Sequence, residues 1–242
     1  MAFEAVFLDF GGTLAYREPE VWDIFSDVCS LNGVNLSRAD IDKGRAMADR
    51  SHRSEQFQTR ELMEYFWQEW FRLILVNLGV AAASDLSREI YLRVMDESNV
   101  LLYGEVKECL PEIADLGVVL GVVSNYNCML EQSCIELGIA DSFQFILASD
   151  LVRSHKPDRV IFDLAVKEAG VERDRCLHIG DSFGADYAGA KNAGVSAVLL
   201  DRLGQEKADC PVVRDLWGIL DLVRGGRRAS ARIDRIDGEK RF

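Results

Sequence analysis

The chain has 242 residues, 48% of them apolar and 28% charged, which is enough to bury one large domain or a core domain with a smaller partner. No apolar run reaches the length of about 18 residues that spans a bilayer, which argues against a membrane helix. The net charge of −12 argues against nucleic acid as a partner.

The N-terminal segment predicts a short buried strand that leads into a tight turn. Residues 4–9 (EAVFLD) form an apolar run, and a Gly-Gly pair follows shortly after it. The segment has no basic n-region and no small-residue cleavage site, so we expect a strand rather than a signal peptide.

Residues 17–99 predict an all-helical segment inserted after this first strand. They are rich in helix-forming residues, and apolar side chains recur at helical spacing, as in Leu62, Phe66 and Trp70. We therefore expect a helical cap over residues 17–99. An exposed part of its aromatic-rich stretch could mediate self-association, so a homodimer stays open.

Helices and strands alternate from about residue 104 onward. Helices are expected at 105–116, 127–138, 159–170, 184–193 and 215–223, and apolar runs at 118–125, 143–150, 175–181 and 195–200. Alternation at this spacing is typical of βα units, so the fold class is α/β with a doubly wound parallel sheet. Residues 1–16 and 100–223 would form this core.

The C-terminal segment, residues 224–242, differs from the rest of the chain in charge. It carries seven Lys/Arg and three Asp/Glu, a net charge of +4, whereas the remainder carries 21 and 37, a net charge of −16. The segment lacks hydrophobic periodicity, which is typical of a disordered tail.

The six cysteines form no CxxC pair, and their spacing matches neither a zinc site nor a disulfide framework. Free thiols in a reducing compartment are the expected state. A cytoplasmic location follows as an expectation.

Several predicted strands end in polar residues: Asp9, the Ser124–Asn125 pair, Asp150 and Asp181. In open parallel sheets, ligands bind beyond the carboxyl ends of the strands. We therefore expect these side chains to surround one crevice.

Asp9 stands at the first of these strand ends, in the string FLDFGGTL. A carboxylate at a strand tip can attack phosphorus and form an aspartyl-phosphate. The glycine-rich turn after it could present backbone N–H groups to an anion. Taken alone, the string is equally typical of an Asp in an ordinary turn.

Two further segments carry groups suited to phosphate: the second strand end, and a lysine before a proline at the start of a helix. The hydroxyl of Ser124 and the adjacent Asn125 could contact phosphoryl oxygens, although both are also common turn and cap residues. Lys156, in SHKPDRVIF, could bring a positive charge to a developing phosphoryl anion, or could be a solvated loop lysine.

The string GDSFGADYAGAKNAG is the most specific of the set. Asp181 and Asp186 flank a glycine-containing turn that leads into a helix. Carboxylates are the hard oxygen ligands that Mg²⁺ takes, together with water and substrate oxygens. Acidic residues at a helix start also satisfy the helix dipole, which is the simpler explanation.

In this order and spacing, the motifs resemble those of the haloacid dehalogenase-like hydrolase superfamily. The resemblance covers residues 4–200 and includes Asp9-x-x-x-Thr13, Ser124, Lys156-Pro157, and Gly180-Asp181 with Asp186. The helical insert is similar to the C1-type cap of that superfamily. The layout is similar to the subgroup typified by haloacid dehalogenase-like hydrolase domain-containing protein 3.

The resemblance implies a phosphatase that acts on a small phosphorylated metabolite. Asp9 would be the nucleophile, and Lys156 would restrain the acidic groups. The implied ligands are, for Mg²⁺, Asp9, the carbonyl of Gly11, Asp181 and Asp186, and, for the substrate, Thr13, Ser124, Asn125 and Lys156. The cap would exclude water and select the leaving group.

One position departs from the phosphatase pattern of that superfamily. Its second Asp, two residues after the nucleophile, serves as general acid and base, and here that position is Gly11. General acid catalysis contributes about 10²–10⁴-fold, or about 3 to 5.5 kcal/mol of barrier. Tyr16, His52 and His155 are candidates to replace it, and substrates with good leaving groups would not need it.

Two other interpretations stay open. The chain could be a different hydrolase of the superfamily, either dehalogenase-like, against which Asp181 and Asp186 count, or phosphonatase-like, for which Lys43 would have to form a Schiff base. Alternatively, it could bind a phosphorylated ligand without turnover, which Gly11 favours and the intact set of acidic residues and Lys156 disfavours.

Overall fold

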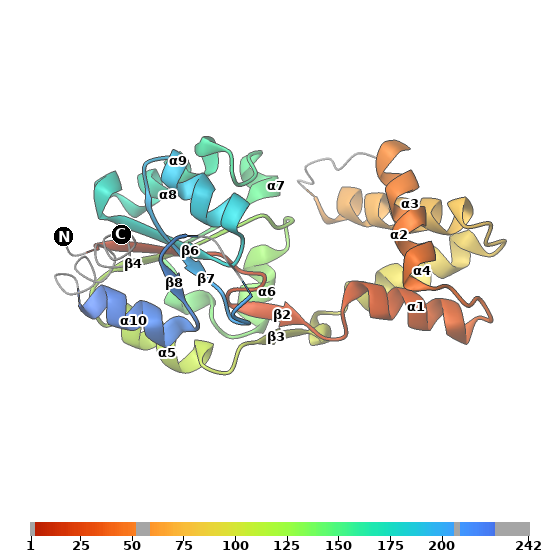
Figure 1. The fold of residues 1–242 in the computed structure, drawn as a ribbon, viewed down its shortest axis with the longest axis horizontal. Coiled ribbons are helices and arrows are strands. Elements are labelled where there is room, and N and C mark those ends of the chain that lie inside the picture. The colour runs from red at the N-terminus through yellow and green to blue at the C-terminus, as the bar shows by residue number, and fades with distance from the viewer. Residues whose placement is uncertain (1–2, 52–58, 206–208, 226–242) are drawn as a thin grey trace, which may run out of the picture. The chain divides into compact units, whose positions relative to one another are not determined.

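The computed structural model describes residues 3–51, 59–205 and 209–225 and divides the chain into two compact units (Figure 1). The core unit comprises Met1–Tyr16 and Leu102–Phe242, and the cap unit comprises Arg17–Leu101. The chain passes between the units along two paired strands, β2 (Ala15–Arg17) and β3 (Val100–Leu102).

A six-stranded parallel sheet forms the centre of the core unit. Its order is β5-β4-β1-β6-β7-β8, with every neighbouring pair parallel. The strands are β1 (Ala5–Leu8), β4 (Val119–Ser124), β5 (Phe145–Ala148), β6 (Cys176–Gly180), β7 (Ser196–Leu200) and β8 (Val212–Val213). The chain starts on a central strand and places later strands on both sides of it, which confirms the predicted parallel α/β sheet.

Helices cover both faces of this sheet. Figure 1 shows α8 and α9 on one face and α5 and α10 on the other. The helices are α5 (Val106–Ala114), α6 (Leu130–Glu136), α7 (Ser149–Val152), α8 (Arg159–Ala169), α9 (Gly189–Asn192) and α10 (Leu216–Arg224). The doubly wound arrangement predicted from the alternation is therefore confirmed.

Local sequence explains where the central elements begin and end. All four residues of β1 are buried, as expected for a strand that is paired on both edges and covered on both faces. The N-cap of helix α8 is Asp158, whose carboxylate accepts a hydrogen bond from the Val160 amide, and its C-cap is Gly170, with a left-handed φ of 66°.

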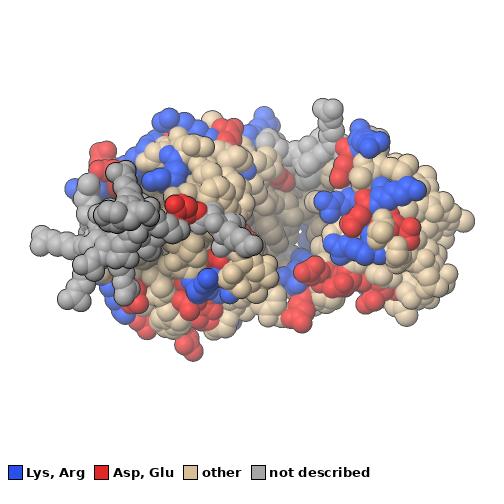
Figure 2. Space-filling view, in the orientation of Figure 1, with Lys and Arg blue, Asp and Glu red and all other residues tan. Residues whose placement is uncertain are grey.

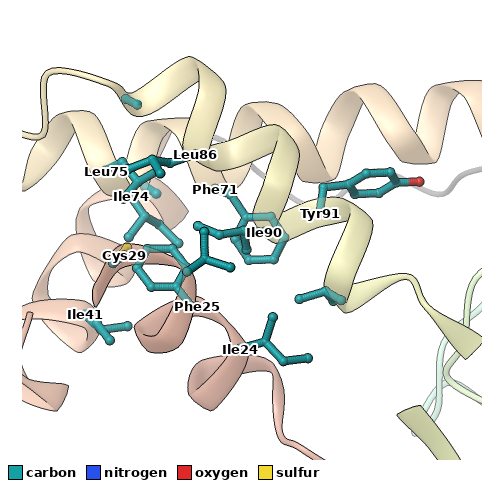
Figure 3. Packing of buried hydrophobic residues seen from close by; sticks show 14 residues of the cluster. Ile24, Phe25, Cys29, Ile41, Phe71, Ile74, Leu75, Leu86, Ile90 and Tyr91 are labelled. Atoms are coloured by element: carbon teal, nitrogen blue, oxygen red, sulfur yellow. The ribbon is translucent and has the colours of Figure 1, made fainter. Parts of the chain in front are cut away.

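The cap unit is helical throughout its described residues between β2 and β3. Its helices are α1 (Val21–Leu31), α2 (Arg38–Ser51), α3 (Arg60–Asn77) and α4 (Ala83–Val94), with a 3₁₀ turn at Glu97–Asn99. Phe25, Phe71, Ile74 and Ile90 lie at the centre of its hydrophobic cluster (Figure 3). The cap unit therefore has an apolar core of its own.

Acidic and basic side chains lie side by side on the face of the molecule in Figure 2. In the cap unit, Arg38 pairs with Asp42 and Arg45 with Asp49, one turn along α2. No helix in the described residues is long and apolar enough to cross a membrane. The predicted tail lies outside the described residues from 226 onward.

Two of the predicted elements differ from the sequence-based expectation. The predicted strand 143–150 ends at Ala148, and Asp150 lies in α7, a short helix closed by Arg153 in the left-handed region at φ 56°. The predicted helix 184–193 begins as a π-helix, Phe183–Ala188, and continues as α9. The wide π turn is visible in the bond from the Tyr187 amide to the Ser182 carbonyl, five residues back.

Candidate active site

The predicted site residues meet at the carboxyl edge of the sheet. Asp9 directly follows β1, Ser124 is the last residue of β4, and Asp181 directly follows β6. Because β1 is paired with both β4 and β6, these three positions are neighbours on one edge.

Lys156 lies at the centre of a buried ion network. Its Nζ donates to Asp9 Oδ1 at 2.6 Å and to Asp186 Oδ1 at 2.5 Å. All three residues are buried, with exposed fractions of 7% for Asp9, 4% for Lys156 and 1% for Asp186. A buried ammonium shared by two carboxylates holds the predicted nucleophile in a defined position.

Three carboxylates form a group that suits a divalent cation. Oxygen atoms of Asp9, Asp181 and Asp186 all lie within 4.8 Å of one another. Hard carboxylate oxygens at this spacing match the ligands of Mg²⁺. With a single lysine among three acids, the group also has an excess of negative charge that a cation would neutralise.

Burial and the neighbouring charges shift the pKa values of the three acids. Burial raises the pKa of Asp9, against the lowering effect of Lys156, and the charge of Asp186 raises it further. Burial together with the charges of Asp9 and Asp186 raises the pKa of Asp181 to about 6. Although burial acts to raise it, the pKa of Asp186 is lowered by its hydrogen bond to His178 and by Lys156.

The ammonium at the centre of the network stays charged. Burial by itself would lower the pKa of Lys156, but the charges of Asp9 and Asp186 outweigh it, and the pKa is raised. Lys156 therefore stays protonated at neutral pH, beside the predicted nucleophile.

Two glycines allow the acidic side chains to approach the backbone. A Cβ at Gly12 would lie 2.2 Å from Asp181 Oδ2, and Gly12 also has a left-handed φ of 74°. A Cβ at Gly180 would lie 2.1 Å from the Cγ of Asp186. Gly11 is different, because no heavy atom of the described residues lies within 4 Å of a Cβ placed there.

The predicted phosphate-binding residues take up three different roles in the structure. Ser124 is 2% exposed and hydrogen-bonds the Asp9 carboxylate. The carboxamide of Asn125 accepts from the Lys156 amide at 2.7 Å and donates to the Lys156 carbonyl at 2.9 Å. Asn125 thus clamps the backbone of Lys156. Thr13 is buried, and its hydroxyl has no hydrogen-bond partner among the described residues.

Of the alternative acids, Tyr16 and His155 make other contacts within the core unit. Tyr16 packs against Tyr103, with ring centroids 4.9 Å apart. The side chain of His155 is 43% exposed, and its Nε2 lies 3.6 Å from Asp150. His52 lies outside the described residues, and Lys43 is an exposed residue of α2. Asp150, expected in the crevice, does not belong to the carboxylate group.

Two residues that the sequence motifs do not include contact the network or its loops. His178, on β6, lies 2.9 Å from Asp186 Oδ1 through its Nε2. Arg202, just after β7, donates to the carbonyl of Thr13 at 2.7 Å. The sequence signal for His178 is a lone polar side chain inside an apolar strand.

A cavity of about 340 Å³ lies beside Asp181 in the core unit. It is lined by Gly12, Tyr103, Asp181, Leu200, Asp201, Arg202, Leu203 and Gln205. The Asp181 carboxylate is thus accessible from this cavity.

Proteins named haloacid dehalogenase-like hydrolase domain-containing protein 3 are similar in sequence to this chain. The one from Danio rerio is 28% identical over 57% of this chain and 60% of its own length, so the chain spans less than two thirds of it. The one from Homo sapiens is 25% identical over 86% of this chain and 84% of its own length. These matches confirm the similarity to that subgroup.

A glyceraldehyde 3-phosphate phosphatase of Methanothermobacter thermautotrophicus is 36% identical over 38% of this chain and 41% of its own length. Among solved structures, the magnesium-bound HAD-hydrolase YfnB of Bacillus subtilis has a TM-score of 0.72. It is 16% identical and covers 93% of this chain and 100% of its own, which shows a shared fold. The model of the haloacid dehalogenase-like hydrolases matches residues 3–194. With this match and the arrangement of the acidic motifs, the chain belongs to the haloacid dehalogenase-like hydrolase family.

Proposed function

We propose that this protein is a Mg²⁺-dependent phosphatase that acts on a small phosphorylated metabolite through an aspartyl-phosphate at Asp9. The observation that carries the proposal is the buried Asp9–Lys156–Asp186 network with Asp181 beside it. The archaeal relative named as a phosphatase and the magnesium named for YfnB support it.

The carboxylates of Asp9, Asp181 and Asp186 and the carbonyl of Gly11 would hold the metal. When bound, Mg²⁺ neutralises the acidic group and the phosphoryl oxygens, so that an anionic nucleophile can approach an anionic substrate. The residues present fit such an ion, because three carboxylates with oxygens within 4.8 Å of one another share a single lysine, and burial together with the charges of Asp9 and Asp186 raises the pKa of Asp181.

Asp9 performs the first step by attacking phosphorus with a carboxylate oxygen. The new bond joins this oxygen to phosphorus, while the bond from phosphorus to the leaving oxygen breaks. Lys156 and Ser124 lie beside Asp9 and would stabilise the phosphoryl charge. In the second step, water attacks phosphorus, the Asp9–phosphorus bond breaks, and phosphate leaves.

Gly11 determines which leaving groups this site can release. An alkoxide must take a proton as it departs, and no side chain exists at position 11 to donate one. Aryl and acyl phosphates leave as stable anions without such a proton. We therefore infer a preference for these substrates, or a proton donor outside the motif pattern.

The test is a phosphate-release screen across aryl, acyl and alkyl phosphates, with Mg²⁺ or with EDTA. The proposal expects Mg²⁺-dependent release that is abolished in Asp9→Asn, a variant of nearly equal size. Thermal melting of both proteins provides the control for folding. Equal rates in the wild type and in Asp9→Asn would refute Asp9 as the nucleophile.

A second candidate function is phosphorylated-ligand binding without turnover, and Gly11 is the observation that favours it. It predicts saturable binding of an alkyl phosphate, measured by calorimetry, with no phosphate release from any substrate class. Chloride release from 2-chloropropionate in EDTA would instead identify a dehalogenase. A borohydride-trapped adduct of a phosphonoaldehyde at Lys43 would identify a phosphonatase.

A further inference from the structure

His178 is a fully buried polar residue that contacts the acidic network through Asp186. It lies on β6, two residues before Gly180, and its exposed fraction is 0%. Its Nε2 lies 2.9 Å from Asp186 Oδ1. Its Nδ1 is also buried and has no hydrogen-bond partner among the residues that the structure describes.

The rest of the imidazole is in contact with apolar groups. The edge of Phe162 packs against the ring, with centroids 5.2 Å apart. In the sheet, His178 is paired with Phe7 on one side and with Ala197 on the other. A buried nitrogen without a partner costs free energy that an aliphatic side chain at this position would avoid. Packing alone therefore does not explain a histidine here.

The partnerless Nδ1 indicates which nitrogen carries the proton. A buried N–H without an acceptor is less favourable than a buried lone pair without a donor. The hydrogen therefore lies on Nε2, which donates it to Asp186 Oδ1.

Asp186 is consequently held at three points. Oδ1 accepts from Lys156 Nζ at 2.5 Å and from His178 Nε2 at 2.9 Å, and Oδ2 accepts from the Ser182 amide at 3.0 Å. Gly180 leaves the space that the carboxylate occupies. Both oxygens are thus directed, one toward Lys156 and the other toward the loop that carries Asp181.

We propose that His178 is a positioning residue for phosphoryl transfer: it orients Asp186, and through Asp186 it orients Lys156 and the acidic group. The catalytic part of this inference rests on the proposed phosphatase function. Removal of a residue that hydrogen-bonds a metal ligand and so orients it typically lowers metal affinity or activity by about 10- to 100-fold.

Two substitutions separate positioning from packing. His178→Gln can place an amide N–H near the position of Nε2, whereas His178→Leu fills the volume without a donor. For His178→Leu we expect kcat to fall roughly 10- to 100-fold, with a smaller change in KM, and the Mg²⁺ concentration for half-maximal thermal stabilisation to rise. His178→Gln should recover most of both losses.

Thermal stability shows whether the contact with Asp186 survives in each variant. Because His178→Leu removes one of the hydrogen bonds that the buried Asp186 carboxylate accepts, the metal-free variant should melt lower than the wild type, and His178→Gln, which keeps a donor, should melt between the two. A kcat and a Mg²⁺ half-saturation in His178→Leu equal to those of the wild type would overturn the proposal. So would losses in His178→Gln as large as those in His178→Leu.

NMR spectroscopy tests the contact between His178 Nε2 and Asp186 without a measurement of turnover. In a ¹H–¹⁵N spectrum of the metal-free protein, the His178 ring should show the proton on Nε2, and Asp186→Asn should shift that signal. A proton on Nδ1, or a signal insensitive to Asp186→Asn, would overturn the inference even if the variants fail to fold. An inactive wild type that shows the Nε2–H signal would refute the phosphatase function but retain the positioning role.

Discussion

Glycine occupies two consecutive positions, 11 and 12, in the loop that follows β1, and the two positions are constrained differently. Gly12 needs its left-handed φ and its lack of a side chain, because a Cβ would collide with Asp181. At Gly11 the space around a Cβ is open in the described residues, and φ lies outside the left-handed region. Steric crowding therefore does not explain why position 11 lacks an acidic side chain.

Gly11→Asp should introduce the missing general acid. We expect kcat for alkyl phosphates to rise by about 10-fold or more, and aryl phosphates to change less, because only an alkoxide needs the proton. The measurement is kcat/KM for one substrate of each class. An equal change for both classes would contradict the explanation.

Gly12→Ala is the matched control for this substitution. Position 12 is one residue further along the same loop. There the alanine Cβ would lie 2.2 Å from Asp181 Oδ2, and the φ of 74° disfavours alanine. Gly12→Ala should therefore weaken the thermal stabilisation by Mg²⁺ and lower turnover of every substrate.

Asp181 links metal binding to stability. In the metal-free protein, burial and the neighbouring carboxylates raise its pKa from 3.8 to about 6. A carboxyl group with a raised folded-state pKa destabilises the folded protein as pH rises from the unfolded value, and the effect is complete above about pH 6. At pH 7.5, Asp181→Asn should therefore melt higher than the wild type in EDTA.

This advantage of Asp181→Asn should shrink as pH falls from 6 toward 4, since the wild-type carboxyl then binds a proton. With Mg²⁺ the order should reverse, because the variant lacks one of the proposed metal ligands and gains less from the ion. Thermal melts from pH 4 to pH 8, with EDTA or Mg²⁺, measure both effects. A variant that melts lower than the wild type in EDTA at pH 7.5 would contradict them.

Among the elements, the segment after β7 contacts the loop that follows β1, which carries Asp9 and Thr13. Arg202 Nη2 donates to the carbonyl of Thr13 at 2.7 Å and pairs with Glu105 at 2.7 Å, next to the start of α5. Its guanidinium lies 3.6 Å from the ring centroid of Tyr103. One planar cation thus joins the loop, α5 and the end of the sheet, outside the family motifs.

Arg202→Lys should lower the free energy of unfolding by about 1–2 kcal/mol, because lysine cannot reproduce the planar stacking and the paired hydrogen bonds. Turnover should fall as the loop loosens. Chemical denaturation measures the change. Arg214→Lys, in the same region but 58% exposed and paired with Asp201, is the control and should cost less than about 0.5 kcal/mol.

The π-helix after β6 is the second element that shapes the site. Its wide turn places Asp186 at 1% exposure beneath Lys156, whereas Phe183 on the same segment is 41% exposed. π turns of this kind are frequent at functional sites. The turn thus brings Asp186, and not its helical neighbours, into the acidic network.

At the scale of the whole molecule, the two units have separate hydrophobic cores. Phe71 is 1% exposed in the cap unit, and Phe162 is fully buried beside the sheet of the core unit. Each core has its own set of buried residues. The units can therefore be destabilised one at a time.

Phe71→Ala should cost about 3–5 kcal/mol within the cap unit, because it leaves a cavity among α1, α3 and α4. Hydrogen exchange should accelerate in these helices and leave the β1 and β6 amides protected. Phe162→Ala should accelerate exchange of the β1 and β6 amides and leave the helices of the cap unit protected. Uniform acceleration in both units by either variant would show that they unfold as one cooperative body.

The sequence by itself determined the order of the elements, the parallel α/β class, the helical insert and the family. It could do so because these depend on hydrophobic periodicity and on motifs close together along the chain, such as Gly180-Asp181 and Asp186. The short strands β2, β3 and β8, of two or three residues, were not predicted, because only pairing with a neighbour stabilises them.

The tertiary structure decided which of the polar strand ends act together. Asp150 turns into α7, Asn125 clamps the backbone of Lys156, and His178 enters the network from inside a strand. These outcomes depend on turn geometry and on pairs far apart in sequence, such as Asp9 with Lys156. The sequence motifs predict Asp9 as the nucleophile, but the groups that contact its carboxylate are defined only where the parallel strands end together.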